Sequence, residues 1–159
     1  MSEIRVGIGY DAHALEEGAP LVLGGVAFES ARGLAGHSDG DVVAHALIDA
    51  ILGAANLGDI GSLFPSGDEQ YRGASSLDLL WEAYREVREA GWELVNADCV
   101  LVGEEPRIGE MRNEMSERLA GALGVEPGRV SVRATTTDGL GFTGRGDGLA
   151  AQAVPLLRR

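Results

Sequence analysis

The chain has 159 residues, of which 45% are hydrophobic, and this size favours one domain, residues 1–159, with a sizeable buried core. Its 25 acidic and 13 basic residues give a formal net charge of −12, which argues against nucleic acid as a partner. All the basic residues are arginine, so sites that need a lysine, such as a P-loop or a Schiff base, are excluded.

A single cysteine, Cys99, cannot form an intramolecular disulfide, which is typical of a reducing compartment. Residues 1–5 show no signal-peptide pattern, and no apolar run reaches the roughly 20 residues of a membrane helix. We therefore expect a cytoplasmic protein with no membrane partner.

Apolar periodicity and glycine positions predict strands and helices that mix along the chain without strict alternation. Strands are expected at residues 4–8, 21–28 (interrupted by Gly24 and Gly25), 92–102, 130–135 and 149–157. Helices are expected from a Ser38–Asp41 capping box to about residue 56, from a Ser75 cap to Gly91 with an apolar stripe that includes Trp81, and over about 110–123. The glycine-rich residues 57–73 and 136–148 are expected to be loops.

This pattern predicts an α+β fold, with a single mixed β-sheet and helices packed on one face as a two-layer sandwich. The other face of the sheet would then be bare. Because so much of the chain is hydrophobic, we expect that face to be buried in a homo-oligomer.

The Gly7–Ala12 segment matches the loose GxGxxA dinucleotide-binding pattern. That pattern requires a helix directly after the glycine turn, and Gly18 and Pro20 leave no room for one. The dinucleotide interpretation is therefore rejected.

The same segment leads into Asp11 and His13, whose side chains project to one side of an extended backbone. With His45 from the first helix, they would offer three ligands to Zn²⁺ or a similar divalent ion and leave one position open. Asp41 and Asp49 flank His45 at helical spacing, and either could accept the hydrogen bond from its second ring nitrogen. The alternative is that Asp11 caps a turn and His45 is an ordinary core or surface histidine.

Three further segments carry groups that could bind a ligand. His37–Ser38 precedes the first helix, where free N–H groups attract anions, although it could equally be a capping serine beside an exposed histidine. Residues 59–61 and 64–68 place carboxylates beside glycines, which suits either a polyol or a solvated acidic loop.

The third segment, Thr135–Asp138, opens the second glycine-rich loop. Its hydroxyl and N–H groups could cradle a phosphate, Asp138 could hold Mg²⁺, and Arg145 is the only fixed cation of that loop. The alternative is a flexible glycine hairpin. A cation at the Asp/His cluster would neutralise what this loop cradles, and the combination points to phosphoryl chemistry.

Three stretches together resemble the 2-C-methyl-D-erythritol 2,4-cyclodiphosphate synthases: GIGYDAH at 7–13, GHSDGDVVAHALIDAILGAANLGDIGSLFP at 36–65 and RATTTDGLGFTGRGDG at 133–148. The resemblance implies a homotrimeric lyase of the non-mevalonate isoprenoid pathway, with active sites between subunits. The substrate would be 4-diphosphocytidyl-2-C-methyl-D-erythritol 2-phosphate, whose 2-phosphate attacks the β-phosphorus and expels CMP. Two alternatives are a metal-dependent phosphohydrolase and a non-catalytic trimer that binds isoprenoid diphosphates.

The resemblance also implies roles for individual residues. Asp11, His13 and His45 would hold a zinc-type ion and touch the substrate, Mg²⁺ or Mn²⁺ would bridge the diphosphate near Asp138, and His37 and Thr136 would stabilise the transition state. The methylerythritol end would be bound by Ser38, Asp59, Ile60, Gly61, Phe64, Pro65, Ser66, Gly67 and Asp68. The cytidine end would be bound by Gly103, Glu104, Glu105, Pro106, Arg107, Ile108, Gly109, Ala134, Thr135, Thr137 and Asp138. Phe142 and Arg145 fall in the family's substrate loop, and Arg145 could face a central channel that holds an isoprenoid diphosphate.

The chain departs from the family's usual residues at three of these positions. Asp138 stands where Glu is usual, Ser66 where Asp is common, and Arg107 where Lys is usual. We expect these changes to tune affinity and to leave the reaction unchanged.

Overall fold

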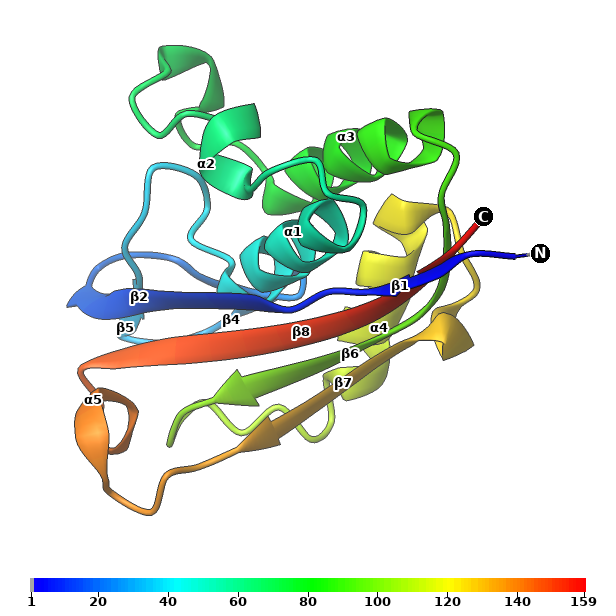
Figure 1. Cartoon of the computed structure of the whole chain (residues 1–159). Helices are drawn as coiled ribbons and strands as arrows, with labels where there is room; N and C mark the ends of the chain where they lie inside the picture. The colour runs from blue at the N-terminus through cyan, green and yellow to red at the C-terminus, as the bar shows by residue number, and fades with distance from the viewer. Residues whose placement is uncertain (1) are drawn as a thin grey trace.

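A computed structural model describes residues 2–159 and shows helices on one face of a mixed β-sheet (Figure 1). Met1, which the single-domain prediction includes, lies outside the described residues. The strands run in the order β5–β2–β8–β6–β7, with β1 also paired to β8, and only β6 and β7 are parallel. Their bounds are β1 Ile4–Val6, β2 Gly9–Glu17, β5 Arg32–Leu34, β6 Glu93–Val102, β7 Val130–Thr135 and β8 Gly148–Arg158. The predicted α+β class is confirmed.

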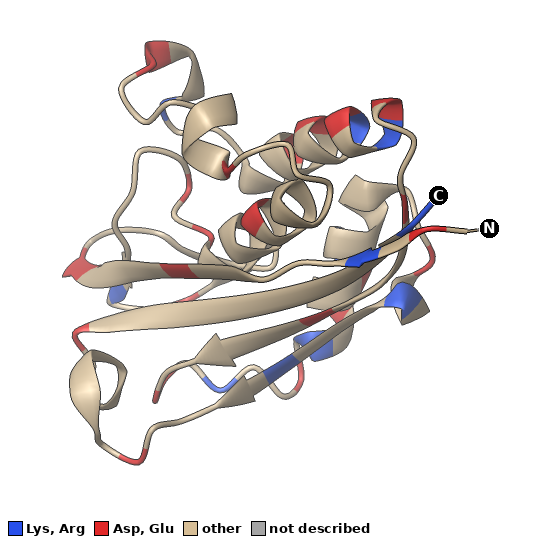
Figure 2. Ribbon diagram, viewed as in Figure 1, with Lys and Arg blue, Asp and Glu red and all other residues tan. Residues whose placement is uncertain are grey.

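The central strand β8 is antiparallel to each of its neighbours. One edge of β8 pairs with β6, while the other pairs first with β2 and then with β1. Its sequence has no acidic residue and one basic residue, Arg158, so the middle of the sheet is almost uncharged (Figure 2). Because β8 pairs with β6 on one edge and with β2 and β1 on the other, it joins the two halves of the sheet.

The helix α1, Val42–Ala54, lies directly on the sheet and is buried at all but two of its positions. The carboxylate of Asp41 accepts the N–H of Ala44 and caps the helix, so the predicted Ser38–Asp41 capping box is wrong. Asp41 itself is the N-cap residue because its own extended backbone precedes the first helical turn.

The other long helices, α3 (Ser76–Glu89) and α4 (Arg112–Leu123), complete the helical layer. Ser75 is the N-cap residue of α3, as predicted, but its side chain makes no cap hydrogen bond, and the first N–H of α3 is accepted by Asp39. Leu80 and Val87 are buried in the apolar stripe of α3, as predicted. Trp81 is 54% exposed, so its predicted place in that stripe is wrong. The predicted end of α4 is confirmed at Gly124, which has the positive φ typical of a helix C-terminus.

Several short elements were not predicted. Residues 21–28 form a hairpin, β3 (Leu21–Leu23) and β4 (Val26–Phe28), because Gly24 and Gly25 both have positive φ and make a two-residue turn. The strand β5 and the full length of β2 were also missed. The regions expected to be loops contain α2 (Ile60–Leu63), η1 (Glu69–Tyr71) and α5 (Gly141–Gly144), and a turn of 3₁₀ helix, η2 (Pro127–Arg129), precedes β7.

The sheet face that carries no helix exposes large apolar side chains. Ile4, Val6 and Ile8 are 66%, 67% and 69% exposed and alternate along β1 and its extension. Tyr10 continues this alternation into β2, and Val154 lies on β8, which pairs with both strands. We call these five residues the apolar strip. Among residues 2–159, no helix has the length and hydrophobicity needed to cross a membrane.

Candidate metal and phosphate site

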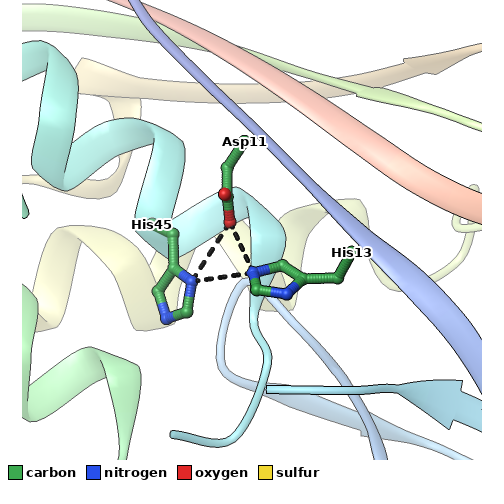
Figure 3. Close-up of side chains that lie close together, drawn as sticks. All are labelled: Asp11, His13 and His45. Carbon is green, nitrogen blue, oxygen red and sulfur yellow. Dashed lines mark hydrogen bonds and ion pairs between the residues drawn. The ribbon is translucent and has the colours of Figure 1, made fainter. Parts of the chain in front are cut away.

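Asp11, His13 and His45 converge on one point between β2 and α1 (Figure 3). Asp11 and His13 are two residues apart on β2 and project to the same side, while His45 reaches them from the first turn of α1. Asp11 Oδ2 lies 2.7 Å from His13 Nε2 and 3.1 Å from His45 Nδ1, and the two ring nitrogens are 3.2 Å apart. The predicted cluster is therefore assembled within one chain.

The chemistry of this cluster fits a divalent ion. One ligand atom from each residue lies within 4.8 Å of the others, and imidazole and carboxylate are common zinc ligands. Donor atoms on a tetrahedral zinc ion lie about 3.3 Å apart, given zinc–nitrogen bonds of about 2.0–2.1 Å. The observed separations fall only slightly below that value, so small side-chain movements would admit the ion.

The charges of the cluster are coupled. Burial raises the pKa of Asp11, but the neighbouring imidazoles of His13 and His45 outweigh this and hold it below its ordinary value. The hydrogen bond to Asp11 raises the pKa of His13 above its ordinary value, against the opposing effect of burial. The carboxylate is thus kept ionised and available as a ligand.

The second ring nitrogen of His45 does not meet either carboxylate predicted for it. Its Nε2 lies 2.8 Å from Ser76 Oγ and 3.0 Å from Ser38 Oγ. Asp41 instead accepts the backbone N–H groups of Gly24 and Gly25, and Asp49 accepts that of Ile60 at 2.7 Å. Both aspartates flank His45 at helical spacing, as predicted, but their carboxylates accept hydrogen bonds from backbone N–H groups and not from the His45 ring.

A cavity of about 200 Å³ opens beside the cluster. It is lined by the three candidate ligands, by His37 and Ser38, by Ile60, Gly61, Phe64 and Ser66 from the predicted methylerythritol segment, and by Tyr71 and Leu79. The ring of His37 donates from Nε2 to the carbonyl of Asp68 at 2.8 Å. Asp59 flanks the cavity and caps α2 by accepting the N–H of Ser62, while Pro65 and Gly67 continue the segment.

A second cavity, of about 420 Å³, contains the predicted cytidine-binding residues. Its walls are Gly103, Glu104, Pro106, Arg107, Ile108, Gly109, Arg112, Ala134, Thr135 and Thr136. The two cavities share no residue: His37 lines the first and Thr136 the second. Glu105, Thr137 and Asp138 adjoin the second cavity in sequence, and Thr136 Oγ1 donates to Asp138 at 3.2 Å.

The remaining predicted residues lie around α5. Phe142 is part of this short helix and Arg145 is its C-cap residue. The guanidinium of Arg145 pairs with Asp147 at 3.0 Å, and both side chains are more than half exposed. Arg145 is therefore within reach of solvent and of a neighbouring molecule.

Four residues near the first cavity were not predicted as part of the site. Tyr71 and Leu79 line the cavity. Ser76 contacts the His45 ring, and Asp39 accepts a hydrogen bond from Ser76. Tyr71 lies in the glycine-rich segment 57–73, and Ser76 and Leu79 follow it in α3, so no spacing rule connects them to α1. Asp39 could have been predicted, since it is an aspartate next to Ser38 and lies just before a helix.

Comparison with known proteins assigns the family. The model of the YgbB family matches residues 4–158. The 2-C-methyl-D-erythritol 2,4-cyclodiphosphate synthase of Moorella thermoacetica is 58% identical over 154 residues, 97% of this chain and 94% of that protein. A solved structure of such a synthase in a CDP-bound form has 40% identity and a TM-score of 0.87 over 96% of this chain and 99% of that one.

A bifunctional relative shows the same fold as part of a longer chain. The structure of the bifunctional IspDF from Campylobacter jejuni has 44% identity and a TM-score of 0.95 over 99% of this chain. The match covers 43% of that protein, so this chain spans less than half of its length. Since a family model covers nearly all of the sequence and a relative with 58% identity covers almost the same span, the chain belongs to the YgbB family of cyclodiphosphate synthases.

Proposed function

We propose that the whole chain acts as one domain that converts 4-diphosphocytidyl-2-C-methyl-D-erythritol 2-phosphate into 2-C-methyl-D-erythritol 2,4-cyclodiphosphate and CMP. The observation that carries the proposal is the Asp11–His13–His45 cluster in the wall of a cavity that also contains His37 and the Ile60–Ser66 segment. Family membership supports the same activity, which belongs to the non-mevalonate route to isoprenoids.

In this reaction an oxygen of the 2-phosphate forms a bond to the β-phosphorus. The bond between that phosphorus and the oxygen bridging to the α-phosphate breaks, and CMP leaves with the electron pair. No water or redox partner is consumed. Because both reacting groups belong to one molecule, correct positioning alone can supply much of the acceleration.

The binding residues then have distinct tasks. Asp11, His13 and His45 would hold a zinc-type ion, whose positive charge would neutralise the β-phosphate when bound. Asp138 would support Mg²⁺ or Mn²⁺ across the diphosphate. His37, oriented by its hydrogen bond to the Asp68 carbonyl, and Thr136 would donate hydrogen bonds to phosphate oxygens as charge shifts between them.

The two cavities would bind opposite ends of the substrate. The first would take the methylerythritol phosphate through Ser38, the Asp59–Gly61 segment and Phe64–Asp68. The second would take cytidine through Gly103–Gly109 and Ala134–Thr137. Because no residue lines both, we propose a homotrimer in which the first cavity of one subunit faces the second cavity of its neighbour. Burial of the apolar strip would stabilise this assembly.

The assembly would also give Arg145 a partner. An exposed guanidinium beside α5 suits the diphosphate of an isoprenoid bound in a central apolar channel, and that ligand is proposed as a further small-molecule partner.

Product analysis tests the reaction. Purified protein is incubated with the cytidylyl substrate and divalent metal, and the products are separated. CMP together with a cyclic diphosphate is expected. CMP with linear phosphates would identify a metal-dependent phosphohydrolase instead, and no turnover with intact isoprenoid diphosphate binding would identify a non-catalytic trimer.

Mixing two inactive variants tests the shared site. His45→Ala damages one cavity and Thr136→Ala the other, and each alone should lose turnover. Subunits mixed one to one after reversible dissociation should recover about a quarter of the sites with both cavities intact, as random assembly of a cyclic trimer predicts. No recovery would place both cavities of an active site in one chain.

A further inference from the structure

A buried serine separates His45 from a second carboxylate. Ser76 is the first residue of α3 and is 0% exposed, and its Oγ lies 2.8 Å from His45 Nε2. That hydroxyl donates to Asp39 Oδ1, and the Ser76 backbone N–H donates to Asp39 Oδ2 at 2.9 Å. The backbone N–H of Asp41 adds a third hydrogen bond to Asp39, at 3.0 Å.

These contacts favour one direction for the proton of the Ser76 hydroxyl. Three donors converge on Asp39, which acts only as an acceptor. The Ser76 hydroxyl therefore gives its proton to Asp39 and presents a lone pair to His45. His45 then carries its proton on Nε2, and its Nδ1 keeps the lone pair on the side of Asp11 and His13.

The opposite tautomer, with the proton on Nδ1, would gain a hydrogen bond of its own. Asp11 Oδ2 lies 3.1 Å from His45 Nδ1 and could accept that proton's hydrogen bond. A proton on Nδ1 blocks the nitrogen that faces the cluster. Ser38 Oγ, at 3.0 Å from Nε2, can donate or accept, so it does not select between the tautomers.

We propose that Asp39 and Ser76 are positioning residues that hold His45 in the tautomer able to bind a cation. The proposal rests on the metal site of the proposed function and adds the group that prepares it. Outer partners of metal-bound histidines typically change metal affinity by about 10–100-fold.

The two residues differ in what their loss should do. Asp39→Asn leaves one acceptor oxygen and an NH₂ group to face three donors, so the Ser76 hydroxyl can turn and donate to Nε2, which favours the imidazole proton on Nδ1. Ser76→Ala removes the link but leaves Ser38 as an acceptor. We expect both variants to weaken zinc binding within the 10–100-fold range, with the larger loss for Asp39→Asn.

The test is zinc affinity at one fixed pH, measured by competition with a chromophoric chelator. Asp78→Asn is the matched control, because it removes an exposed carboxylate from the same end of α3, and its affinity should equal that of the wild type. In the Ser76→Ala background, Asp39→Asn should cause no further loss. An equal loss in both backgrounds would mean that Asp39 acts through its charge or through folding, and would overturn the proposal.

The wild-type protein gives a second measurement that does not depend on the folding of a variant. In zinc-loaded, ¹⁵N-labelled protein, His45 should show a proton on Nε2, and zinc coordination through Nε2 would overturn the proposal. If the wild type fails to bind zinc, the proposed metal site itself is wrong. If it binds zinc and Asp39→Asn binds equally well, only the positioning role is wrong.

Discussion

Gly9 of β2 lies directly against Ala46 of α1, with no space for a side chain between them. A Cβ built on Gly9 would be 1.8 Å from the Ala46 carbonyl oxygen and 2.8 Å from the Ala50 nitrogen. This close approach brings α1 onto the strand two residues before Asp11, and His45 is the neighbour of Ala46. The glycine that imitates a dinucleotide motif therefore allows the strand and helix halves of the metal cluster to meet.

Replacing Gly9 with alanine should separate these halves. The added methyl must push α1 away from β2, and overpacking of this kind typically costs about 1–3 kcal/mol. We expect a lower free energy of unfolding and weaker zinc binding, measured by denaturant titration and chelator competition. Gly53→Ala is the control: it lies within α1 with nothing within 4 Å of its Cβ, so it should be neutral or stabilising. Equal behaviour of the two variants would contradict this account.

Asp49 should matter for substrate binding. Its carboxylate accepts the N–H of Ile60 at 2.7 Å and ties the start of α2 to α1 at the edge of the first cavity. Asp49→Ala removes a hydrogen bond to a charged group, worth about 1.5–3 kcal/mol. We expect KM to rise several-fold while kcat changes less, in steady-state assays of CMP release. Asp78→Ala should leave both constants unchanged, and a loss confined to kcat would argue for a role in the chemical step.

Asp41 should make stability depend on pH. Burial raises its pKa to about 6, against the opposing effect of three backbone N–H donors, whereas the unfolded chain keeps an ordinary value near 3.8. A raised folded pKa means that this contribution is complete below about pH 3.8 and is lost as pH rises through about 6. In the metal-free protein the wild type should therefore lose roughly 1 kcal/mol relative to Asp41→Asn between pH 5 and pH 7.

Urea unfolding of both proteins at the two pH values measures this difference. Asp78→Asn, compared with the wild type in the same way, should show a difference that does not change with pH. If the advantage of the wild type over Asp41→Asn grew as pH rose, the carboxyl would be stabilised in its ionised form and the account above would be wrong.

The apolar strip should be needed for assembly. Val6 lies at the centre of the apolar strip and is 67% exposed. A charged side chain at this position would be buried without a partner in any complex that covers the strip. Val6→Asp is expected to dissociate the oligomer and to lower turnover with it, as seen by sedimentation and CMP release. Trp81→Asp changes an equally conspicuous residue on α3, in the helical layer, and should leave assembly intact. Assembly that survives Val6→Asp would exclude the strip as the interface.

The sequence predicted those features that depend on local periodicity. The long helices, β6, β7 and β8 follow from apolar spacing, and the Asp11–His13–His45 cluster follows from two side chains on a strand and one on the next helix. The prediction failed where a distant backbone group decided the outcome. Asp41 and Asp49 were expected to serve His45, but N–H groups from a hairpin and from α2 occupy them.

The same reason explains the remaining errors. Ser75 is the N-cap residue of α3, yet its hydroxyl makes no cap hydrogen bond, and Asp39, 37 residues before Ser76, accepts the first N–H of the helix. The extended backbone at Asp11 and His13 was expected, but the full length of β2 was not, because it depends on pairing with β8, which is distant in sequence. The sequence alone does not predict which of several nearby carboxylates will accept the hydrogen bond of a buried donor.

The strand that joins the two halves of the sheet comes after all the other elements in sequence order. Until residues 148–158 have been synthesised, β2 and β6 have no common neighbour, and a ribosome-bound fragment exposes the unpaired edges of both. Closing the sheet also joins segments more than a hundred residues apart, a topology that folds slowly. The sheet should therefore close only after β8 has been synthesised, with the nascent chain at its most aggregation-prone shortly before that point.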